Sequence, residues 1–240
     1  MSYIYRLRPS NTLTLDEITN NYLWFSRPTE FKDVDDSNVM SFMEINETLG
    51  DALNRIFGHF MDVAKEVSKN GICCFTETLP SIEDWSKFPK GHNGIFIEYR
   101  KDILEDFFAR HFGIGDCFKK VDYLLNPLYF KSSSNYDVLW KTNEDGELYI
   151  SLKEFERNDR LRDELFLRMF TRINYKYQDQ KELRIILGGR NIPDKSEGLS
   201  GYKIPIPKEA INMIYAHPKT PDTVISHLSY NYTERLTIAK

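Results

Sequence analysis

The sequence is poor in cysteine and has no long hydrophobic run. Its 240 residues include three cysteines. Cys73 and Cys74 are adjacent and Cys117 lies far along the chain, so neither a disulfide framework nor a zinc knuckle is expected. No apolar stretch approaches the roughly 20 residues that a membrane-spanning helix needs. The first residues carry neither a basic leader nor an apolar signal core. These absences favour a cytoplasmic protein that does not enter the membrane.

Several ligand-binding motifs are missing as well. No Gly-x-Gly-x-x-Gly or Walker-type loop occurs, which argues against a Rossmann or P-loop nucleotide site. The five histidines are scattered and none forms an i, i+4 pair, so no metal site of that kind is expected. The formal net charge is −4, from 32 basic and 36 acidic residues. A protein that binds nucleic acid through bulk positive charge is therefore not expected.

Apolar and aromatic residues are plentiful and predict a well-packed core. They make up 41% and 14% of the chain, which argues against disorder. At roughly 150 residues per domain, the length favours one domain over 1–240. Within it we expect a catalytic core over about 1–190 and a C-terminal strand–helix extension over about 200–240. Strand-like and helix-like periods mix without strict alternation, which predicts an α+β fold. The longest helices are expected over about 47–69 and 153–173.

The run over 180–187 carries the most informative polar pattern. Its apolar members alternate onto a core face: Leu183, Ile185 and Leu187. The same alternation places Gln180, Glu182 and Arg184 together on the other face. That face could be solvent-exposed, with a Glu182–Arg184 pair worth under ~1 kcal/mol. It could instead line a cleft in which Glu182 steadies a developing positive charge, as glycosidase carboxylates do. Arg184 would then fix that charge and Gln180 would position a substrate.

Two further places could bind a ligand. Arg6 and Arg8 share a face of the first expected strand, and a guanidinium can fork onto a phosphate or bind a ribose. That role requires their strand to border Glu182; a surface position is the simpler interpretation. His92 lies in a Gly-His-Asn-Gly loop, where it could donate to a phosphate or be purely structural.

Short motifs follow one another in a characteristic order. They are Tyr5-Arg6, Leu23-Trp24-Phe25-Ser26-x-Pro28-x-x-Phe31-x-Asp33, Cys74-Phe75-Thr76-Glu77, Trp85-Ser86, His92-x-Gly94, Val121-x-Tyr123 and Tyr177-x-x-Gln180-x-Glu182-x-Arg184. Their order, up to about residue 215, resembles a bacterial and phage-associated family that is catalogued only as a domain of unknown function. Lys32 stands where that family has Asn, and Gln180 stands where it has the first Glu of the late motif.

The change to Gln180 makes the chain similar to the ADP-ribosyltransferases. Their signature is an Arg or His on the first strand, a Ser on the second and a Gln-x-Glu on a late strand. The resemblance implies a split, mostly antiparallel sheet with flanking helices and a cleft that holds NAD as co-substrate. It assigns the cofactor site to four residues: Tyr5, Arg6, Ser26 and Phe31.

The resemblance also implies individual roles. Arg6 would contact the ribose or diphosphate of NAD, and Ser26 would order the nicotinamide side. Glu182 would bind the nicotinamide-ribose hydroxyl and stabilise the oxocarbenium ion, while Gln180 would select the target. Two further residues would position the substrate: Arg184 and His92.

These expectations describe a toxin or phage-defence effector that transfers ADP-ribose to a macromolecular acceptor. The acceptor (RNA, DNA or protein) stays open, and an antitoxin protein is an expected partner. One alternative is a metal-dependent nuclease of a defence system. Its ligands would come from five carboxylates: Asp33, Asp35, Glu77, Glu98 and Glu182. The other is a non-enzymatic regulatory or adaptor module, in which the Glu182–Arg184 pair is structural.

Overall fold

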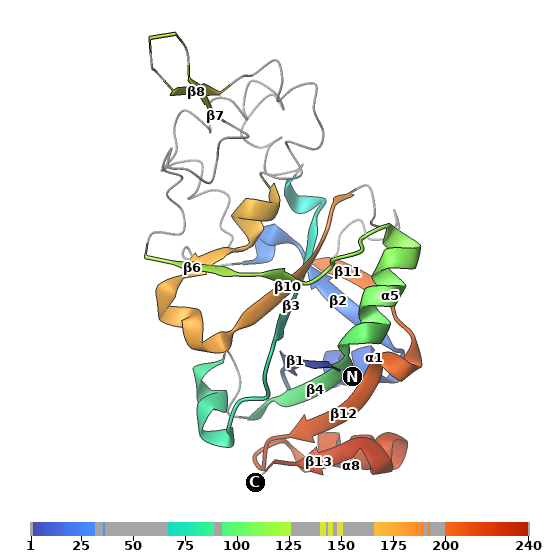
Figure 1. Cartoon of the computed structure of the whole chain (residues 1–240). Helices are drawn as coiled ribbons and strands as arrows, with labels where there is room; N and C mark the ends of the chain where they lie inside the picture. Colours follow the sequence, from blue (N-terminus) through green and yellow to red (C-terminus); the bar gives the residue numbers. More distant parts are fainter. Residues whose placement is uncertain are drawn as a thin grey trace.

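The protein is a mixed α/β structure built around a mostly antiparallel sheet. The computed structural model describes residues 2–31, 36, 67–88, 93–125, 140–142, 144–145, 148–150, 166–189, 192 and 200–239. Figure 1 shows the sheet crossing the centre of the molecule, with the longer helices on its right-hand side. No helix in these ranges combines the length and the apolar character that crossing a membrane requires.

Nine strands of the described chain form the main sheet. They are β1 (Tyr3–Arg8), β2 (Tyr22–Ser26), β3 (Gly71–Thr76), β4 (Ile95–Arg100), β5 (Lys119–Lys120), β10 (Glu182–Leu187), β11 (Gly201–Pro205), β12 (Ile211–Ala216) and β13 (Leu236–Ile238). The order is β11-β2-β3-β1-β4-β12-β13, with β10 beside β3 and β5 beside β10. β12 and β13 are parallel, and the other neighbours in this sheet are antiparallel. The segment expected as a C-terminal extension therefore supplies three strands to the sheet.

Smaller elements flank this sheet. β6 (Asp122–Leu124) pairs in parallel with β9 (Arg172–Asn174), and β7 (Trp140–Thr142) pairs antiparallel with β8 (Leu148–Ile150). The α-helices are α1 (Thr12–Thr19), α5 (Lys101–Phe112) and α8 (Asp222–Tyr232). Short 3-10 helices are η1 (Pro28–Glu30), η2 (Ile82–Lys87), η4 (Tyr175–Gln180), η7 (Lys208–Ala210) and η8 (Thr233–Arg235).

Local sequence explains where the helices begin and end. The Asn11 side chain accepts a hydrogen bond from the Thr14 N–H at 3.0 Å and caps α1. α5 ends at Gly113, whose φ of +69° is a left-handed conformation that glycine adopts without steric cost. α8 follows Pro221, which is compatible with a helix start.

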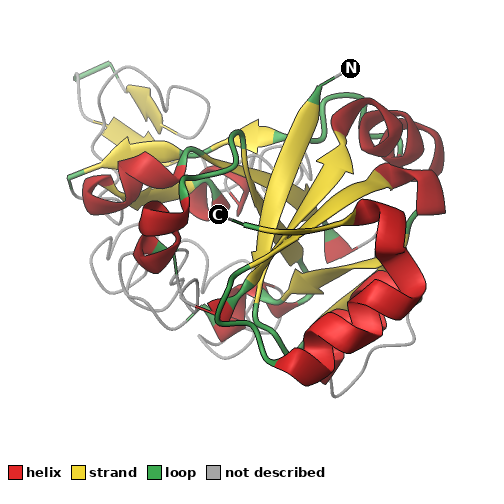
Figure 2. Ribbon diagram, turned by 90° about the horizontal axis from the view of Figure 1, so that it is seen from below, coloured by secondary structure: helices red, strands yellow, loops and turns green. Residues whose placement is uncertain are grey.

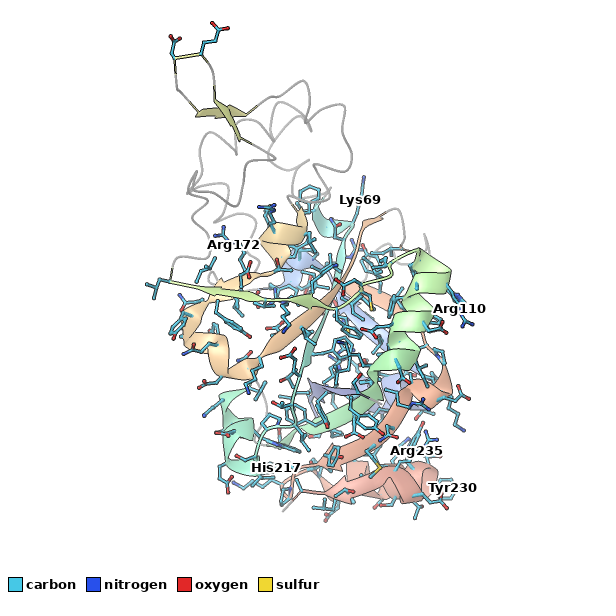
Figure 3. The ribbon with its side chains drawn as sticks, viewed as in Figure 1. Lys69, Arg110, Arg172, His217, Tyr230 and Arg235 are labelled. Carbon is cyan, nitrogen blue, oxygen red and sulfur yellow. The ribbon has the colours of Figure 1, made fainter. Side chains whose placement is uncertain are left out.

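One face of the sheet packs against all three α-helices. We call it the packed face, and its buried strand residues include Ile4, Phe25, Phe75, Ile97 and Leu183. The helices contribute Ile18, Leu104, Phe108, Val224 and Leu228 to the same cluster. Figure 2 shows the longer helices gathered on one side of the strands. The exposed Arg110 and Tyr230 point outward from α5 and α8 (Figure 3). The hydrophobic core therefore lies between the helices and this face.

The sheet forks at β3. One edge of β3 pairs with β10 along its whole length. The other edge pairs with β2 where Ile72 faces Ser26, and with β1 where Thr76 faces Tyr5. The β2–β11 pair and the β1–β4–β12–β13 group therefore leave β3 from opposite ends.

The sequence-based elements are confirmed in part. Strands over 3–8 and 22–26 and the helix near 102–112 are present. The expected strand over 180–187 begins only at Glu182, because Gln180 belongs to η4 and Lys181 has a left-handed φ of 44°. The expected helix over 153–173 is wrong at its end, where β9 occupies Arg172–Asn174. Most of that helix, and most of the helix expected over 47–69, lies outside the described residues.

Candidate functional site

A row of four side chains crosses the sheet on the face opposite the helices. Glu182 of β10 faces Thr76 of β3, Thr76 faces Tyr5 of β1, and Tyr5 faces Glu98 of β4. Residues directly opposite each other in antiparallel strands project from the same face. We call this the polar face, defined by Tyr5, Ser26, Thr76, Glu98 and Glu182.

Ser26 joins this face at the far end of β3. It lies opposite Ile72, four residues before Thr76, and positions 72, 74 and 76 project to the same side. The predicted cofactor residues Tyr5 and Ser26 thus stand at the two branches of the fork, on the same face as Glu182. A binding role for either one stays a prediction.

Glu182 belongs to a buried ionic cluster centred on Arg184. Arg184 has no exposed side-chain surface; its Nε donates to Glu182 Oε1 at 2.7 Å and its Nη2 to Asp36 Oδ1 at 2.8 Å. Its Nη1 donates to the Phe170 carbonyl oxygen at 2.7 Å, and the guanidinium lies over the Phe31 ring at 5.6 Å. The interpretation as a solvent-exposed pair is therefore wrong. Arg184 positions Glu182 and packs Phe31, and it has no free surface with which to touch a substrate.

The charges of this cluster shift nearby pKa values. Burial by itself lowers the pKa of Arg184, but the carboxylates of Glu182 and Asp36 outweigh it and raise that pKa well above its usual value. Burial, reinforced by the Glu182 charge, raises the pKa of the Cys74 thiol well above its usual value. Cys74 is therefore a neutral thiol and not a nucleophile at neutral pH.

Tyr123 is a neighbour of Glu182 to which the sequence analysis gave no role. Its hydroxyl oxygen accepts a hydrogen bond from the Glu182 backbone N–H at 2.7 Å. Burial raises the pKa of Tyr123 to about 12, so it keeps its proton. Tyr123 thus holds the first residue of β10 in place. The Val121-x-Tyr123 motif was the feature of the sequence that could have pointed to this residue.

Arg6 does not face Glu182, contrary to the expectation. It is 5% exposed on the packed face and forms an ion pair with Glu17 of α1. Its Nη2 donates to the Trp24 carbonyl oxygen at 2.6 Å. Because Tyr5 is the residue that faces Thr76, the next side chain on β1 must project to the other side of the sheet. The assignment of Arg6 to a cofactor site shared with Glu182 is therefore wrong.

Gln180 lies beside the row but not on its strand. Its backbone oxygen accepts a hydrogen bond from Thr76 Oγ1 at 2.6 Å. Its side-chain Nε2 is 3.5 Å from the Lys87 carbonyl oxygen. The expectation that Gln180 and Glu182 share one strand face is wrong, because the left-handed Lys181 turns the chain between them.

A cavity of about 680 Å³ opens between η2 and η4 at the end of β3. Its lining includes Thr76, Ser81, Lys87, Phe88, Gln180 and Lys181. Figure 1 places the two 3-10 helices on the left of the sheet, away from α1 and α5. The volume falls in the range of about 300–1,000 Å³ that small-molecule sites occupy. Thr76 belongs both to this lining and to the row.

Those carboxylates of the nuclease alternative that the structure describes do not lie close together. Asp33 and Asp35 lie outside the described residues, as does His92. Glu77 is exposed near Lys120, at 3.5 Å. Glu98 and Glu182 are three strand spacings apart, roughly 14 Å. Within the described ranges, no group of three or more His, Cys, Asp and Glu side chains could hold a metal ion.

Glu98 is a buried carboxylate for which the sequence analysis considered only a metal. It is 5% exposed, and its oxygens accept hydrogen bonds from Tyr215 Oη at 3.1 Å and from the Asn212 side chain. Tyr5 also donates to it. The signal in the sequence was an acidic residue inside the otherwise apolar and aromatic run Ile95–Tyr99.

Comparisons with protein-family models, with curated proteins and with solved structures each return no match to this chain. The family resemblance drawn from the motifs therefore stays a prediction.

Proposed function

We propose that this protein is an ADP-ribosyltransferase that uses NAD as co-substrate and has an ADP-ribosyltransferase-like fold. The observation that carries the proposal is the forked sheet with Glu182, Tyr5 and Ser26 on one face. A carboxylate, an aromatic side chain and a hydroxyl thus line the two branches of the fork. The cavity that Thr76 helps to line lies at one end of β3, next to the same row.

The chemistry assigned to Glu182 follows from its surroundings. Its side chain is 9% exposed, so little water screens its charge. Arg184 holds the carboxylate in place, which leaves Glu182 to accept the nicotinamide-ribose hydroxyl and to stabilise positive charge at the ribose carbon. The bond from that carbon to the nicotinamide nitrogen breaks, and its electron pair leaves with the neutral nicotinamide. The acceptor then bonds to the ribose carbon and loses its proton.

The acceptor is a macromolecule: RNA, DNA or protein. The role as a toxin or phage-defence effector, and the antitoxin partner, rest on the motif resemblance. We expect expression of the wild type to slow the growth of a bacterial host. Glu182→Gln should abolish that effect while the protein still accumulates. Equal toxicity of the two forms would contradict the proposed activity.

The decisive experiment follows label from NAD into an acceptor. Purified protein is incubated with NAD labelled on its adenylate phosphate and with cell lysate, RNA and DNA in turn. Glu182→Gln is the sharpest variant, because the amide oxygen can still accept from Arg184 Nε while the charge is lost. Glu77→Gln is the matched control, since Glu77 follows the same β3 end but is exposed.

We expect label to enter one acceptor class with the wild type and with Glu77→Gln. Losing one preorganised electrostatic contact typically slows a reaction by about 10²–10³, so Glu182→Gln should show that loss. Absence of both label transfer and nicotinamide release with folded wild type would overturn the proposal. Metal-dependent cleavage of the same RNA or DNA would then favour the nuclease.

A further inference from the structure

The cavity between η2 and η4 has walls that are held in place from outside it. The indole Nε1 of the buried Trp85 donates to the Pro80 carbonyl oxygen at 3.1 Å, and its ring packs on Phe96 at 4.7 Å between centroids. On the other side, Thr76 Oγ1 donates to the Gln180 carbonyl oxygen at 2.6 Å and ties η4 to the end of β3. A site that is already formed loses less conformational entropy when a ligand binds.

The two walls offer a ligand different surfaces. The segment around η2 contributes the apolar residues of the lining: Leu79, Pro80 and Phe88. η4 and the residue that follows it contribute only polar ones: Gln178, Asp179, Gln180 and Lys181. A ligand in the cavity therefore meets apolar groups on one side and hydrogen-bonding groups on the other.

The polar side chains of the η2 wall are engaged with one another. Ser81 Oγ donates to Asp84 Oδ2 at 2.9 Å, and Lys87 Nζ pairs with Asp84 Oδ1 at 2.8 Å. These contacts hold the η2 wall together, so most of the hydrogen bonding to a ligand must come from η4.

The side chains of η4 retain that capacity. Asp179 lies 4.0 Å from Lys87, and the Gln180 amide makes one long contact of 3.5 Å. Within the described ranges, the side chains of Gln178 and Lys181 make no hydrogen bond or ion pair. An amide donates and accepts, a carboxylate accepts and an ammonium group donates. The η4 wall therefore presents both donors and acceptors to a ligand.

The charges of the lining balance one another. Lys87 and Lys181 stand against Asp84 and Asp179, and the described lining contains no arginine. Arginine is the side chain best suited to phosphate, because its fork binds two oxygens at once. A phosphate group would also meet the two carboxylates, so the lining favours a ligand without net charge.

We propose that this cavity binds a neutral saccharide. A sugar ring presents C–H groups on its face and hydroxyls around its edge. The face packs against apolar and aromatic side chains, and each hydroxyl both donates and accepts a hydrogen bond, as the η4 wall requires. Glu182 is not part of the lining, so this site is separate from the proposed reaction and does not depend on the use of NAD.

The test measures binding of neutral sugars to the purified protein by saturation-transfer NMR and calorimetry at millimolar concentration. The probes are glucose, galactose, mannose, N-acetylglucosamine, maltose and lactose. Adenosine and guanosine are tested beside them, together with the 6-phosphate of any sugar that binds. We expect at least one neutral sugar to bind, and its 6-phosphate to bind no more tightly.

Gln178→Ala is the sharpest variant, because it removes an amide that donates and accepts. Gln178 is exposed, so its truncation should leave the fold intact. We expect the variant to weaken sugar binding about tenfold, as the loss of two hydrogen bonds predicts. Glu77→Gln is the matched control, since Glu77 is exposed and follows Thr76 but lies outside the lining.

Three outcomes overturn the inference. The first is that no neutral sugar binds the folded wild type. The second is a sugar affinity that Gln178→Ala leaves unchanged, because the sugar then binds elsewhere. The third is binding of adenosine or guanosine in place of the sugars, which would identify a nucleoside site. The proposed function fails separately, since nicotinamide release from NAD is measured without any sugar.

Discussion

The two faces of the sheet each bury an arginine–glutamate pair, but among the described side chains the ratio of guanidinium groups to carboxylates is reversed. On the packed face, two guanidinium groups share one carboxylate: Arg6 and Arg8 both pair with Glu17. On the polar face, one guanidinium is shared by two carboxylates: Arg184 pairs with Glu182 and Asp36. Among the described side chains, the first cluster thus contains two guanidinium groups and one carboxylate, and the second contains one guanidinium group and two carboxylates.

The difference shows that the same kind of ion pair can connect two elements in the core or hold a carboxylate on the polar face. The Arg6–Glu17 pair joins β1 to α1 inside the core, where Glu17 is 1% exposed. The Arg184 cluster includes Glu182, which faces Thr76, a residue of the cavity lining. Glu98 adds a second negative charge to that face.

The largest expected loss of stability follows from removing the carboxylate of the packed-face cluster, which consists of Arg6, Arg8 and Glu17. Glu17→Ala leaves the buried guanidinium group of Arg6 and the half-buried one of Arg8 without their carboxylate. Removing one partner of a buried pair typically costs about 3–5 kcal/mol of unfolding free energy. Urea denaturation measures the loss. Label transfer per folded molecule should stay near the wild-type value, and a selective loss of transfer would contradict the division between the two faces.

The corresponding change on the polar face removes the charge of Glu182. Glu182→Gln should slow label transfer by about 10²–10³ while the urea midpoint stays close to that of the wild type, because the Gln oxygen can still accept from Arg184. A midpoint as low as that of Glu17→Ala, with transfer intact, would identify Glu182 as structural and favour the adaptor interpretation.

The adjacent Cys73 and Cys74 sharpen the comparison, because they project to opposite faces. Burial raises the pKa of Cys73 to about 12 and that of Cys74 well above its usual value, with Glu182 adding to the second shift. Removing the negative charge in Glu182→Gln lowers the pKa of Cys74, so its alkylation by iodoacetamide should begin at a lower pH. Cys73 should not change. Tandem mass spectrometry after a pH series of labelling distinguishes the two residues.

The smallest expected effect concerns an exposed pair next to the packed cluster. Hydrogen bonds from Lys203, at 2.7 Å, and from Tyr22 lower the pKa of Asp16 below its usual value. A lowered carboxyl pKa stabilises the fold above the unfolded-state value of about 4, and the contribution is lost as pH falls below it. Because both side chains are exposed, Lys203→Met should cost at most about 1 kcal/mol at pH 7. Urea titrations should show this difference shrinking as pH falls from about 5 to about 2, and a constant difference would contradict the ionic origin.

Several parts of the site followed from local patterns. The alternation of Leu183, Ile185 and Leu187 correctly predicts a buried strand face, and it correctly places Glu182 and Arg184 on the other side. The burial of Arg184 did not follow, because Asp36 reaches it from 148 residues away and no local pattern encodes that contact.

Other parts depended on how strands pair. The alternation of side chains along β1 would place Arg6 on the same face as Glu182 only if Arg6 were the residue opposite Thr76. In the structure Tyr5 is opposite Thr76, so Arg6 projects to the other face. Gln180 was predicted to share a strand face with Glu182, but the left-handed residue Lys181 turns the chain just before β10 begins. Glu98 drew attention only as a metal ligand, since its partners Tyr5, Tyr215 and Asn212 come from two other strands.

The amino-acid sequence by itself determined several of the elements and the two-sided character of strands such as β1 and β10. Alternation of side chains, helix caps and glycines at helix ends depend on residues that are neighbours in the chain, so they can be recognised in the sequence alone. Tertiary structure alone decided which faces meet: the fork at β3, the register that puts Tyr5 in the row and Arg6 in the core, and the bulge at Asn212. The physical reason is that a shift of one residue in strand pairing moves every side chain to the opposite face, and only contacts between distant segments fix that shift.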